Sequence, residues 1–326
     1  MAGGMGTRLR SITGDTPKPM VPLLGRPMME HIIILLREQG FTDICAAVRY
    51  RAGDIMGYFG DGSRFGVKLQ YRVEDRALGT AGGVKNCRDF YGGEDFLVIS
   101  GDTACDFELR TLMDAHRSRG ADAAIALYRS SEPLRYGLAV TDSGGLVRSF
   151  IEKPDWSRVV TDLVNTGIYV LSPRAMELVP DGAEYDFGKQ LFPQLLERSG
   201  TILGVPMDGY WCDVGTPLSY YRCCVDALEG RLRLDLPEQF RPGSESKAED
   251  TPENADYAEE CPCKSRAELM GALSELMLDM GADYSDGLHL RSERYSLHIR
   301  PCADRSAVRI GVRADDAEFA KELALS

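Results

Sequence analysis

The sequence predicts an α/β protein, in which helices cover a mixed, mostly parallel sheet, followed by a small α+β unit. Short β-rich runs alternate with helical periods from residue 1 to about residue 232, and this alternation is typical of a mostly parallel sheet covered by helices. The length of 326 residues is sufficient for two domains. A hydrophobic content of 44% supplies ordinary globular cores.

A helix is predicted between Pro27 and Gly40. Proline fits the first turn of a helix, and glycine can adopt the left-handed conformation that closes one. The apolar face of this helix is formed by Ile32, Ile33, Leu35 and Leu36.

Three strands are predicted in the next sixty residues. Residues 43–48 form the first, and residues 67–73 alternate apolar and polar side chains, as an edge or half-exposed strand does. Residues 96–99 are a continuous apolar run, which predicts a central buried strand. Because Ser100-Gly101-Asp102 follows this run, the Asp102 carboxylate is expected just beyond the carboxyl end of a strand, where open α/β sheets bind ligands.

The composition changes after residue 234. Residues 244–260 contain seven acidic residues against one lysine, so residues 235–264 are predicted to be a disordered acidic linker between a domain at 1–234 and a unit at 265–326. Ser265 and Glu268 form a capping box ahead of an amphipathic helix that ends at Gly281. Short strands near Leu288, at 295–299 and at 308–312, and a last helix from about Asp315, complete the predicted small unit.

Charge and cysteine content exclude some functional classes. The formal net charge of −12 argues against a nucleic acid partner, because phosphate backbones are bound by basic surfaces. The sequence has no apolar run long enough for a membrane helix and no signal peptide, and its nine cysteines form no repeated C-x-x-C pairs. We therefore expect free thiols, no membrane partner and a cytoplasmic location.

The first twenty-two residues join a glycine loop to two cations. Gly3, Gly4 and Gly6 allow close approach of backbone N–H groups to a polyphosphate, and Arg8 can bind its oxygens with a planar guanidinium. Lys18 lies between two prolines on a stiff backbone. This combination predicts chemistry on a nucleoside triphosphate.

Further motifs follow in a defined order, and together with the glycine loop they closely resemble those of the sugar-1-phosphate nucleotidyltransferases. Within that family the pattern looks most like the mannose-1-phosphate guanylyltransferases, particularly bacterial proteins in which this domain is fused to a phosphohexomutase. The resemblance covers nearly all of residues 1–235 and implies a Rossmann-like domain. The motifs are Glu74 with Leu78-Gly-Thr-Ala-Gly-Gly83, Gly101-Asp102, Tyr136-Gly137, Glu152-Lys-Pro154, Asn165-Thr-Gly167 and Trp211-Cys-Asp-Val-Gly215.

The resemblance implies that an oxygen of a hexose-1-phosphate attacks the α-phosphate of a nucleoside triphosphate, releasing pyrophosphate. By resemblance, Asp102 and Asp213 are the expected Mg²⁺ ligands, since this metal takes hard oxygen donors. Arg8 would stabilise the triphosphate and the leaving group, and Lys18 the α-phosphate. The catalytic residues expected are therefore Arg8, Lys18, Asp102 and Asp213.

The remaining motif residues are expected to bind the two substrates. Lys153 would hold the phosphate of the sugar, and Glu152 would accept hydrogen bonds from its hydroxyl groups. Glu74 would face the base, because a carboxylate can accept from N1–H and the exocyclic amine of guanine; this assignment rests on chemistry rather than spacing. The nucleotide-binding set is Gly3, Gly4, Gly6, Thr7, Glu74, Gly79 and Thr80, and the sugar-phosphate set is Gly137, Glu152, Lys153, Asn165 and Thr166. Tyr210 and Trp211 are expected to pack beside Asp213 rather than bind a ligand.

The chain departs from the family at both ends. In relatives a short apolar strand precedes the glycine loop; without it we expect the loop to lack an anchored N-terminal side and a gap to open between neighbouring strands, and we hypothesise that Met1 is an internal methionine of a longer chain. The C-terminal unit resembles the last domain of phosphohexomutases, but its loop after Arg300-Pro301 reads Cys302-Ala-Asp-Arg-Ser306. No mutase activity is therefore expected.

Two alternatives stay open. One is a uridylyl-, thymidylyl- or cytidylyltransferase acting on glucose-1-phosphate, and the other is a non-catalytic sensor that binds a nucleotide sugar and regulates a partner enzyme. The resemblance also makes a homo-oligomer more expected than a monomer.

Overall fold

The computed structural model describes residues 1–4, 6, 9, 14–152, 155, 159–228, 230–236, 257–262, 288–291, 295–301 and 307–314. The chain divides into two compact units. Unit 1 comprises Met1–Gly4 and Ile32–Trp211, and unit 2 comprises Met5–His31 and Cys212–Ser326.

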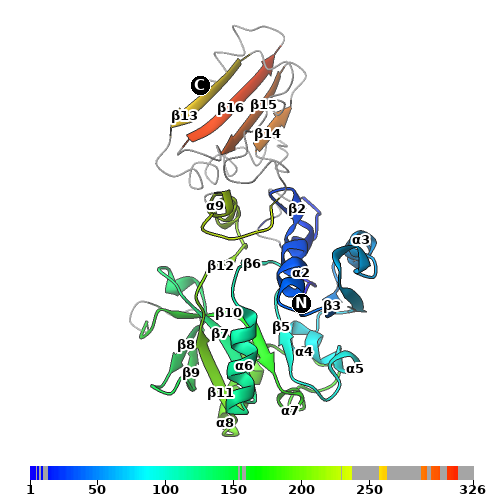
Figure 1. The fold of residues 1–326 in the computed structure, drawn as a ribbon, viewed down its shortest axis with the longest axis vertical. Helices are drawn as coiled ribbons and strands as arrows, with labels where there is room; N and C mark the ends of the chain where they lie inside the picture. The colour runs from blue at the N-terminus through cyan, green and yellow to red at the C-terminus, as the bar shows by residue number, and fades with distance from the viewer. Residues whose placement is uncertain are drawn as a thin grey trace. The chain divides into compact units, whose positions relative to one another are not determined.

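Unit 1 is built on a mixed sheet with the strand order β11-β7-β10-β8-β9, in which β5 also pairs with β10 (Figure 1). Strands β5, β7, β8 and β11 run in one direction, because β5, β7 and β8 each pair antiparallel with β10 and β11 pairs parallel with β7. The α/β class with a mixed sheet is thus as predicted. The strands are β5 (Phe96–Val98), β7 (Ala123–Arg129), β8 (Leu138–Thr141), β9 (Val147–Ile151), β10 (Leu163–Leu171) and β11 (Ile202–Pro206).

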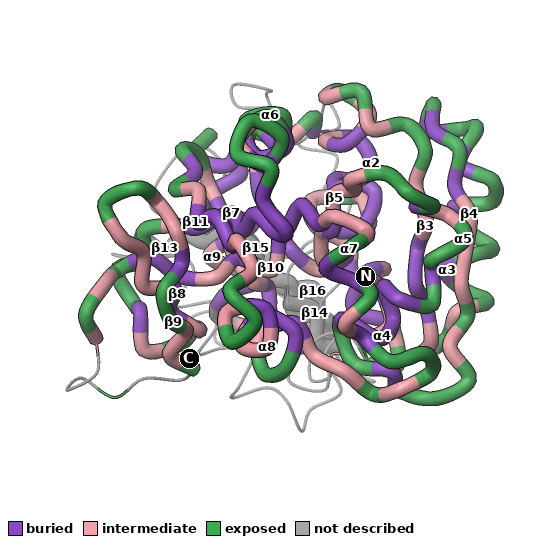
Figure 2. Tube along the Cα trace, turned by 90° about the horizontal axis from the view of Figure 1, so that it is seen from below, coloured by how far each residue is buried: buried purple, intermediate pink, exposed green. Residues whose placement is uncertain are grey.

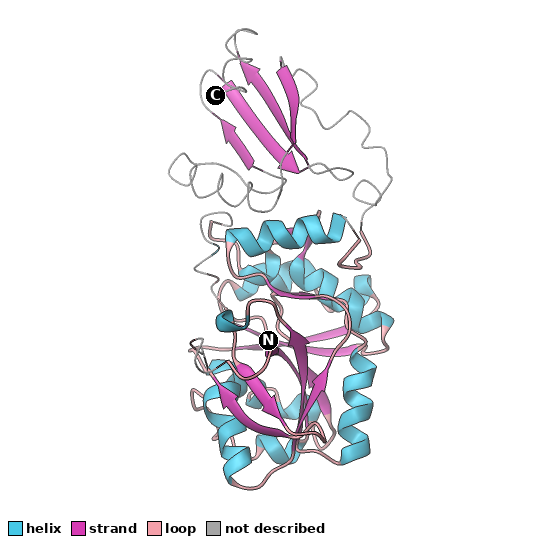
Figure 3. Ribbon diagram, turned by 90° about the vertical axis from the view of Figure 1, so that its left-hand side faces the viewer, coloured by secondary structure: helices cyan, strands magenta, loops and turns pink. Residues whose placement is uncertain are grey.

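Helices lie on both sides of this sheet (Figure 3). Alternate residues of β7 point to opposite faces: Ile125 joins the core that contains Phe187 and Phe192, whereas Ala124 joins the core that contains Leu112 of α6. Figure 2 shows β7 as buried while the outer side of α6 is exposed. The helical elements of these two cores include α6 (Leu109–Arg119), η6 (Phe187–Leu191), which is a π-helical turn, and α8 (Phe192–Glu197).

A second, two-stranded parallel sheet lies in the same unit. It consists of β3 (Asp43–Val48) and β4 (Lys68–Val73), close to the predicted ranges. The alternating sequence of β4 gives a half-exposed strand, as predicted, because β4 pairs only with β3 within the described residues. The neighbouring helices are α2 (Met28–Glu38), α3 (Ala52–Phe59) and η3 (Ser63–Phe65).

Met1 and Ala2 link the two sheets. Ala2 forms a parallel bridge with Val48 and donates its N–H to the carbonyl of Ala47 (2.8 Å). On the other side, the Met1 amine donates to the carbonyl of Ile99 (2.8 Å), and Gly101 donates to the carbonyl of Met1 (2.7 Å). The expectation that the glycine loop lacks an anchored N-terminal side is therefore wrong, because Met1 and Ala2 are hydrogen-bonded on both sides. As the expected gap implies, β3 and β5 belong to separate sheets in the described part of the chain.

Shorter elements complete unit 1. These elements are α4 (Gly79–Lys85), α5 (Arg88–Tyr91), β6 (Thr103–Cys105), η4 (Pro133–Arg135) and α7 (Pro173–Met176).

None of the described helices is long and apolar enough to cross a membrane.

Unit 2 contains short elements near the glycine loop and a separate antiparallel sheet. The first group is η2 (Lys18–Met20), β1 (Pro22–Leu23), β2 (Arg26–Pro27) and α9 (Pro217–Leu228), with β12 (Trp211–Asp213) at the boundary between the units. The sheet has the order β13-β16-β15-β14. Its strands are β13 (Tyr257–Pro262), β14 (Leu288–Arg291), β15 (Tyr295–Pro301) and β16 (Ala307–Ala314).

Strand β13 corrects the predicted linker. It lies within residues 235–264, yet Tyr257–Pro262 pairs along its whole length with β16. Backbone hydrogen bonding to a strand about fifty residues later outweighs the acidic composition that predicted disorder. The helices predicted at 265–281 and from residue 315 lie outside the described residues.

Candidate active site

Gly3, Arg49 and Glu74 lie together at the carboxyl ends of β3 and β4. Glu74 directly follows β4, and its N–H donates to the carbonyl of Val48 (2.9 Å). A Cβ on Gly3 would lie 3.5 Å from the Cβ of Arg49 and 4.0 Å from Oε2 of Glu74. Gly3 therefore lies beside the carboxylate that we assigned to the base.

Burial dominates the electrostatics of Glu74. It raises the pKa of this carboxyl above its ordinary value, and a hydrogen bond from the backbone of Leu78 and the charge of Arg49 oppose that effect. A half-buried carboxylate is a stronger hydrogen-bond acceptor than an exposed one, because water competes less. Glu74 is thus suited to bind N–H groups of a ligand.

Thr80, at the start of α4, is engaged within the protein. Its hydroxyl donates to Oδ2 of Asp186 (2.8 Å) and accepts from the N–H of Phe187 (3.0 Å). The single hydroxyl proton is therefore in use. A contact from Thr80 to a nucleotide would have to come from its backbone or displace Asp186.

Asp102 lies beyond the carboxyl end of β5, as its sequence pattern predicted. The hydroxyl of Ser100 donates to Oδ1 of Asp102 (2.5 Å). Gly101, just before it, packs against the first two residues of the chain, since a Cβ there would lie 3.1 Å from the carbonyl oxygen of Met1. Asp102 and the beginning of the glycine loop thus lie next to each other in unit 1.

Gly137, Glu152 and Asn165 form a second group in unit 1. The N–H of Asn165 donates to the carbonyl of Gly137 (2.8 Å). A Cβ on Gly137 would lie 3.0 Å from Oε2 of Glu152, so this glycine leaves room for the carboxylate. The side chain of Asn165 is hydrogen-bonded to Tyr169, whose pKa burial raises well above its ordinary value. Three residues of the predicted sugar-phosphate set are therefore neighbours.

Thr166 differs from that group because its side chain is buried. Its hydroxyl donates to the carbonyl of Ala126 (2.7 Å), inside the irregular register of β10 between Asn165 and Tyr169. The indole N–H of Trp211 donates to the carbonyl of Thr166 (3.1 Å). Trp211 therefore packs in the core, as predicted, and the Thr166 hydroxyl holds two strands together.

Unit 2 brings together Gly6, Lys18 and Asp213. Nζ of Lys18 lies 3.2 Å from Oδ1 of Asp213, and the side chains are 9% and 38% exposed. Gly6 has φ +61, and a Cβ on it would lie only 2.9 Å from the Cβ of Lys18. Glycine is thus needed here both for its backbone conformation and for the close approach of the lysine.

For four other predicted site residues the structure provides little information. A Cβ on Gly4 would meet no atom within 4 Å among the residues that the structure describes. Thr7, Arg8 and Lys153 lie outside the described residues.

The family model described as "Nucleotidyl transferase" matches residues 1–230. The chain belongs to this family.

Relatives of this nucleotidyl transferase carry several substrate names. The chain is 38% identical over 258 residues to a UTP–glucose-1-phosphate uridylyltransferase of Synechocystis, and the match covers 75% of this chain and 66% of the relative. It is 33% identical over 231 residues to a mannose-1-phosphate guanylyltransferase of Mycobacterium tuberculosis, covering 71% and 64%. The chain thus spans about two thirds of the length of these relatives.

The fold is shared with a solved structure. The crystal structure of HddC from Yersinia pseudotuberculosis in complex with GMP-PN aligns with a TM-score of 0.60 and 30% identity, covering 68% of this chain and 95% of that one.

Two residues that contact predicted site residues were missed at the sequence level. Arg49 is the first residue after β3, so the strand-end argument that was used for Asp102 could also have found Arg49. Asp186, which holds Thr80, belongs to the Asp186-Phe-Gly-Lys189 turn. Its contact spans 106 residues of sequence, and no local signal marks it.

The donor set suits a hard divalent cation. Within the described residues, no cluster of three or more histidine, cysteine, aspartate or glutamate side chains could hold a metal. Asp213 uses Oδ1 in its pair with Lys18, which leaves Oδ2 for another ligand. Mg²⁺ is often bound by one or two carboxylates plus phosphate oxygens, and Asp102 in unit 1 and Asp213 in unit 2 are carboxylates of this kind.

Proposed function

We propose that this chain transfers a nucleotidyl group from GTP to mannose-1-phosphate. A phosphate oxygen of the sugar-1-phosphate forms a bond to the α-phosphorus, the bond from the α-phosphorus to the oxygen shared with the β-phosphate breaks, and pyrophosphate leaves with that electron pair. The buried Lys18 held by Asp213 at 3.2 Å carries this proposal, because a fixed cation beside a carboxylate serves phosphoryl chemistry.

The residues of the chain act by positioning and by charge. Lys18 would stabilise the negative charge that builds on the α-phosphate, and Arg8 the triphosphate and its leaving group. Lys153 would hold the attacking phosphate in line. Mg²⁺, held by Asp102 and Asp213, would supply neutralisation of phosphate charge when bound.

Glu74 supports guanine as the base. Its carboxylate can accept two hydrogen bonds, and guanine offers N1–H and its exocyclic amine side by side. Uracil offers one N–H between two carbonyl oxygens, which an ionised carboxylate would repel. HddC, whose crystal structure contains GMP-PN, is a relative of the same fold.

The sugar would bind at the group formed by Gly137, Glu152 and Asn165. Glu152 is exposed and can accept from sugar hydroxyls, and Gly137 leaves space beside it. The predicted contribution of Thr166 would come from its backbone, because its hydroxyl is bonded to Ala126. A homo-oligomeric state, a cytoplasmic location and the absence of mutase activity are further parts of this proposal.

A glucose-1-phosphate uridylyltransferase is the second candidate, and the relative from Synechocystis with 38% identity supports it. Pyrophosphate release should be measured with Mg²⁺ for four nucleoside triphosphates, each combined with mannose-1-phosphate and glucose-1-phosphate. We expect turnover with GTP and mannose-1-phosphate; turnover confined to UTP and glucose-1-phosphate would select the second candidate.

The variants Asp213→Asn and Asp102→Asn distinguish an enzyme from a non-catalytic sensor. An enzyme loses turnover in these variants while its thermal melting is retained. A sensor has no turnover to lose, and the wild-type chain would bind GDP-mannose in calorimetry without releasing pyrophosphate from any pair of substrates.

A further inference from the structure

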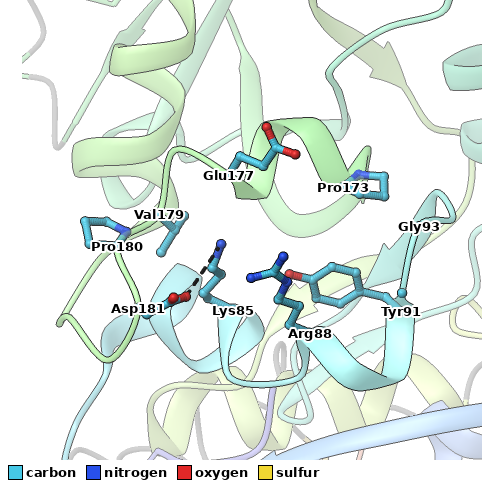
Figure 4. Close-up of a pocket in the computed structure, with 10 residues that line it drawn as sticks. Lys85, Arg88, Tyr91, Gly93, Pro173, Glu177, Val179, Pro180 and Asp181 are labelled. Atoms are coloured by element: carbon cyan, nitrogen blue, oxygen red, sulfur yellow. Dashed lines mark ion pairs between the residues drawn. The ribbon is translucent and has the colours of Figure 1, made fainter.

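A cavity of about 500 Å³ lies in unit 1, and none of its lining residues belongs to the motifs named above (Figure 4). One wall comes from the end of α4 and from α5, and the other from α7 and the loop that follows it. Ligand sites commonly have volumes of roughly 300–1,000 Å³. The residues used below are Lys85, Arg88, Tyr91, Glu177 and Asp181.

Two cations point into this cavity from the first wall. The Lys85 side chain is only 9% exposed, and its Nζ donates to the carbonyl of Met176 (2.9 Å) and lies 3.8 Å from Oδ1 of Asp181. Arg88, three residues later, is exposed, and its guanidinium makes no hydrogen bond or ion pair with the described part of the chain. Figure 4 shows both groups directed toward the same space. They can bind an anion together, since residues three apart on a helical path are neighbours.

The opposite wall carries acceptors. Asp181 lies 3.8 Å from Lys85, and its side chain is 82% exposed, whereas the Glu177 carboxylate belongs to the same wall but is not directed at Lys85 or Arg88 (Figure 4). Pro173 and Pro180 add apolar surface. These carboxylates would repel a purely anionic ligand, and Lys85 and Arg88 would repel a purely cationic one.

Tyr91 completes the chemistry between the two walls. Its ring is buried, and burial raises the pKa of its hydroxyl above the ordinary value, so this group stays a hydrogen-bond donor. Donors for a phosphate and acceptors for hydroxyl groups therefore occur within one cavity, beside two prolines that can pack against a sugar ring. The Tyr91 ring itself is stacked on Phe96.

We propose that this cavity is a second ligand site, which binds a sugar monophosphate with its phosphate on Lys85 and Arg88 and its hydroxyls on Glu177 and Asp181. The site is separate from the sugar-phosphate group at Gly137 and Glu152. It lies at the end of α4 opposite to Gly79 and Thr80, and its binding chemistry does not depend on the proposed function.

Glucose-6-phosphate is the probe, because its phosphate is not on the carbon that a nucleotidyl transfer requires. Binding to the wild-type chain is measured by isothermal calorimetry. We expect Arg88→Ala to weaken it by about tenfold or more, because a charge-assisted hydrogen bond is lost. Lys85→Met should act in the same direction. Arg117→Ala, an exposed arginine on α6, is the matched control, and Glu152→Ala tests the other sugar group; both should bind as the wild type does.

Equal binding by the wild type and Arg88→Ala, or loss of binding in Glu152→Ala, would overturn the proposal, as would no binding to the wild type. Inorganic phosphate and glucose are the comparison ligands. We expect both to bind at least tenfold more weakly than glucose-6-phosphate. Phosphate that binds as tightly as the sugar phosphate would contradict the role of Glu177 and Asp181. Because Arg88 is exposed, its variant keeps the test decisive even if Lys85→Met fails to fold.

Discussion

Lys18 and Asp213, which are 195 residues apart in sequence, form an ion pair with 3.2 Å between Nζ and Oδ1. Two groups expected to act on the same reaction therefore neutralise each other's charge. A triphosphate that takes over Lys18 would release a carboxylate oxygen for a cation, so binding of the nucleotide and of Mg²⁺ should each strengthen the other.

Lys18→Met should lower the turnover by on the order of 10²–10³, because a fixed cation at the transferring phosphate is lost. Thermal melting should change little, since Asp213 remains 38% exposed and can be solvated. Lys68→Met is the control: this lysine is 72% exposed and lies 3.7 Å from Asp43 in the small sheet. Pyrophosphate release measures both variants, and a turnover of Lys18→Met within threefold of the wild type would contradict the assignment.

Glu74→Gln should reduce the preference for GTP over UTP and alter the pH dependence of stability. Because burial raises the folded-state pKa of Glu74 above its ordinary value of 4.5, the folded state binds this proton more tightly than the unfolded state. The resulting stability is present below pH 4.5 and is lost as the pH rises through the raised pKa. The melting temperature of Glu74→Gln relative to the wild type should therefore increase with pH. A difference in melting temperature between Glu74→Gln and the wild type that stays constant with pH would refute the expectation.

Thr80 and Asp186 should be energetically coupled. Thr80→Val removes the hydroxyl that donates to Asp186 and accepts from Phe187, and we expect a loss of about 1 kcal/mol in the free energy of unfolding. In a double-mutant cycle with Asp186→Ala, the combined loss should be smaller than the sum of the single losses. Thr111→Val, on the exposed side of α6, is the control. Additive losses in chemical denaturation would count against this contact.

Two glycine substitutions should have opposite effects on stability. Gly79 has φ +68, and a Cβ there would lie 2.5 Å from the carbonyl oxygen of Tyr185. Gly79→Ala should therefore cost about 1–3 kcal/mol. Gly53 lies in α3 with no atom within 4 Å of an added Cβ, so Gly53→Ala should gain roughly 0.5–1 kcal/mol through helix propensity. Urea denaturation measures both, and changes of the same sign would show that strain at Gly79 is relieved elsewhere.

Local patterns predicted the first strands of the fold well. The sequence placed strands at 43–48, 67–73 and 96–99, and the structure has Asp43–Val48, Lys68–Val73 and Phe96–Val98. Alternation and apolar runs record which side of a strand is buried, so they locate it without knowledge of its partners. Strand β13 was missed because its partner β16 lies far along the chain.

Prediction of the site residues has the same limit, because contacts between residues that are distant in sequence could not be predicted. The strand-end argument predicted where Asp102 lies, beyond the carboxyl end of β5. Glu74 was assigned from the resemblance and from the chemistry of a carboxylate, and its role stays a prediction. The sequence could not tell that the hydroxyls of Thr80 and Thr166 are bonded within the protein, because their partners Asp186 and Ala126 are distant in sequence.

The Leu78-Gly-Thr-Ala-Gly-Gly83 segment is fixed by packing as well as by any ligand. An added Cβ would overlap the carbonyl oxygen of Tyr185 at Gly79 and that of Ala183 at Gly82, and both are backbone atoms. Mutation would therefore be resisted at these glycines in any descendant that still folds, even after its chemistry had been lost. In such a lineage Lys18 and Asp213 would diverge first. Substitutions at those two positions, and not at the glycines, would therefore identify a paralogue that has lost its activity.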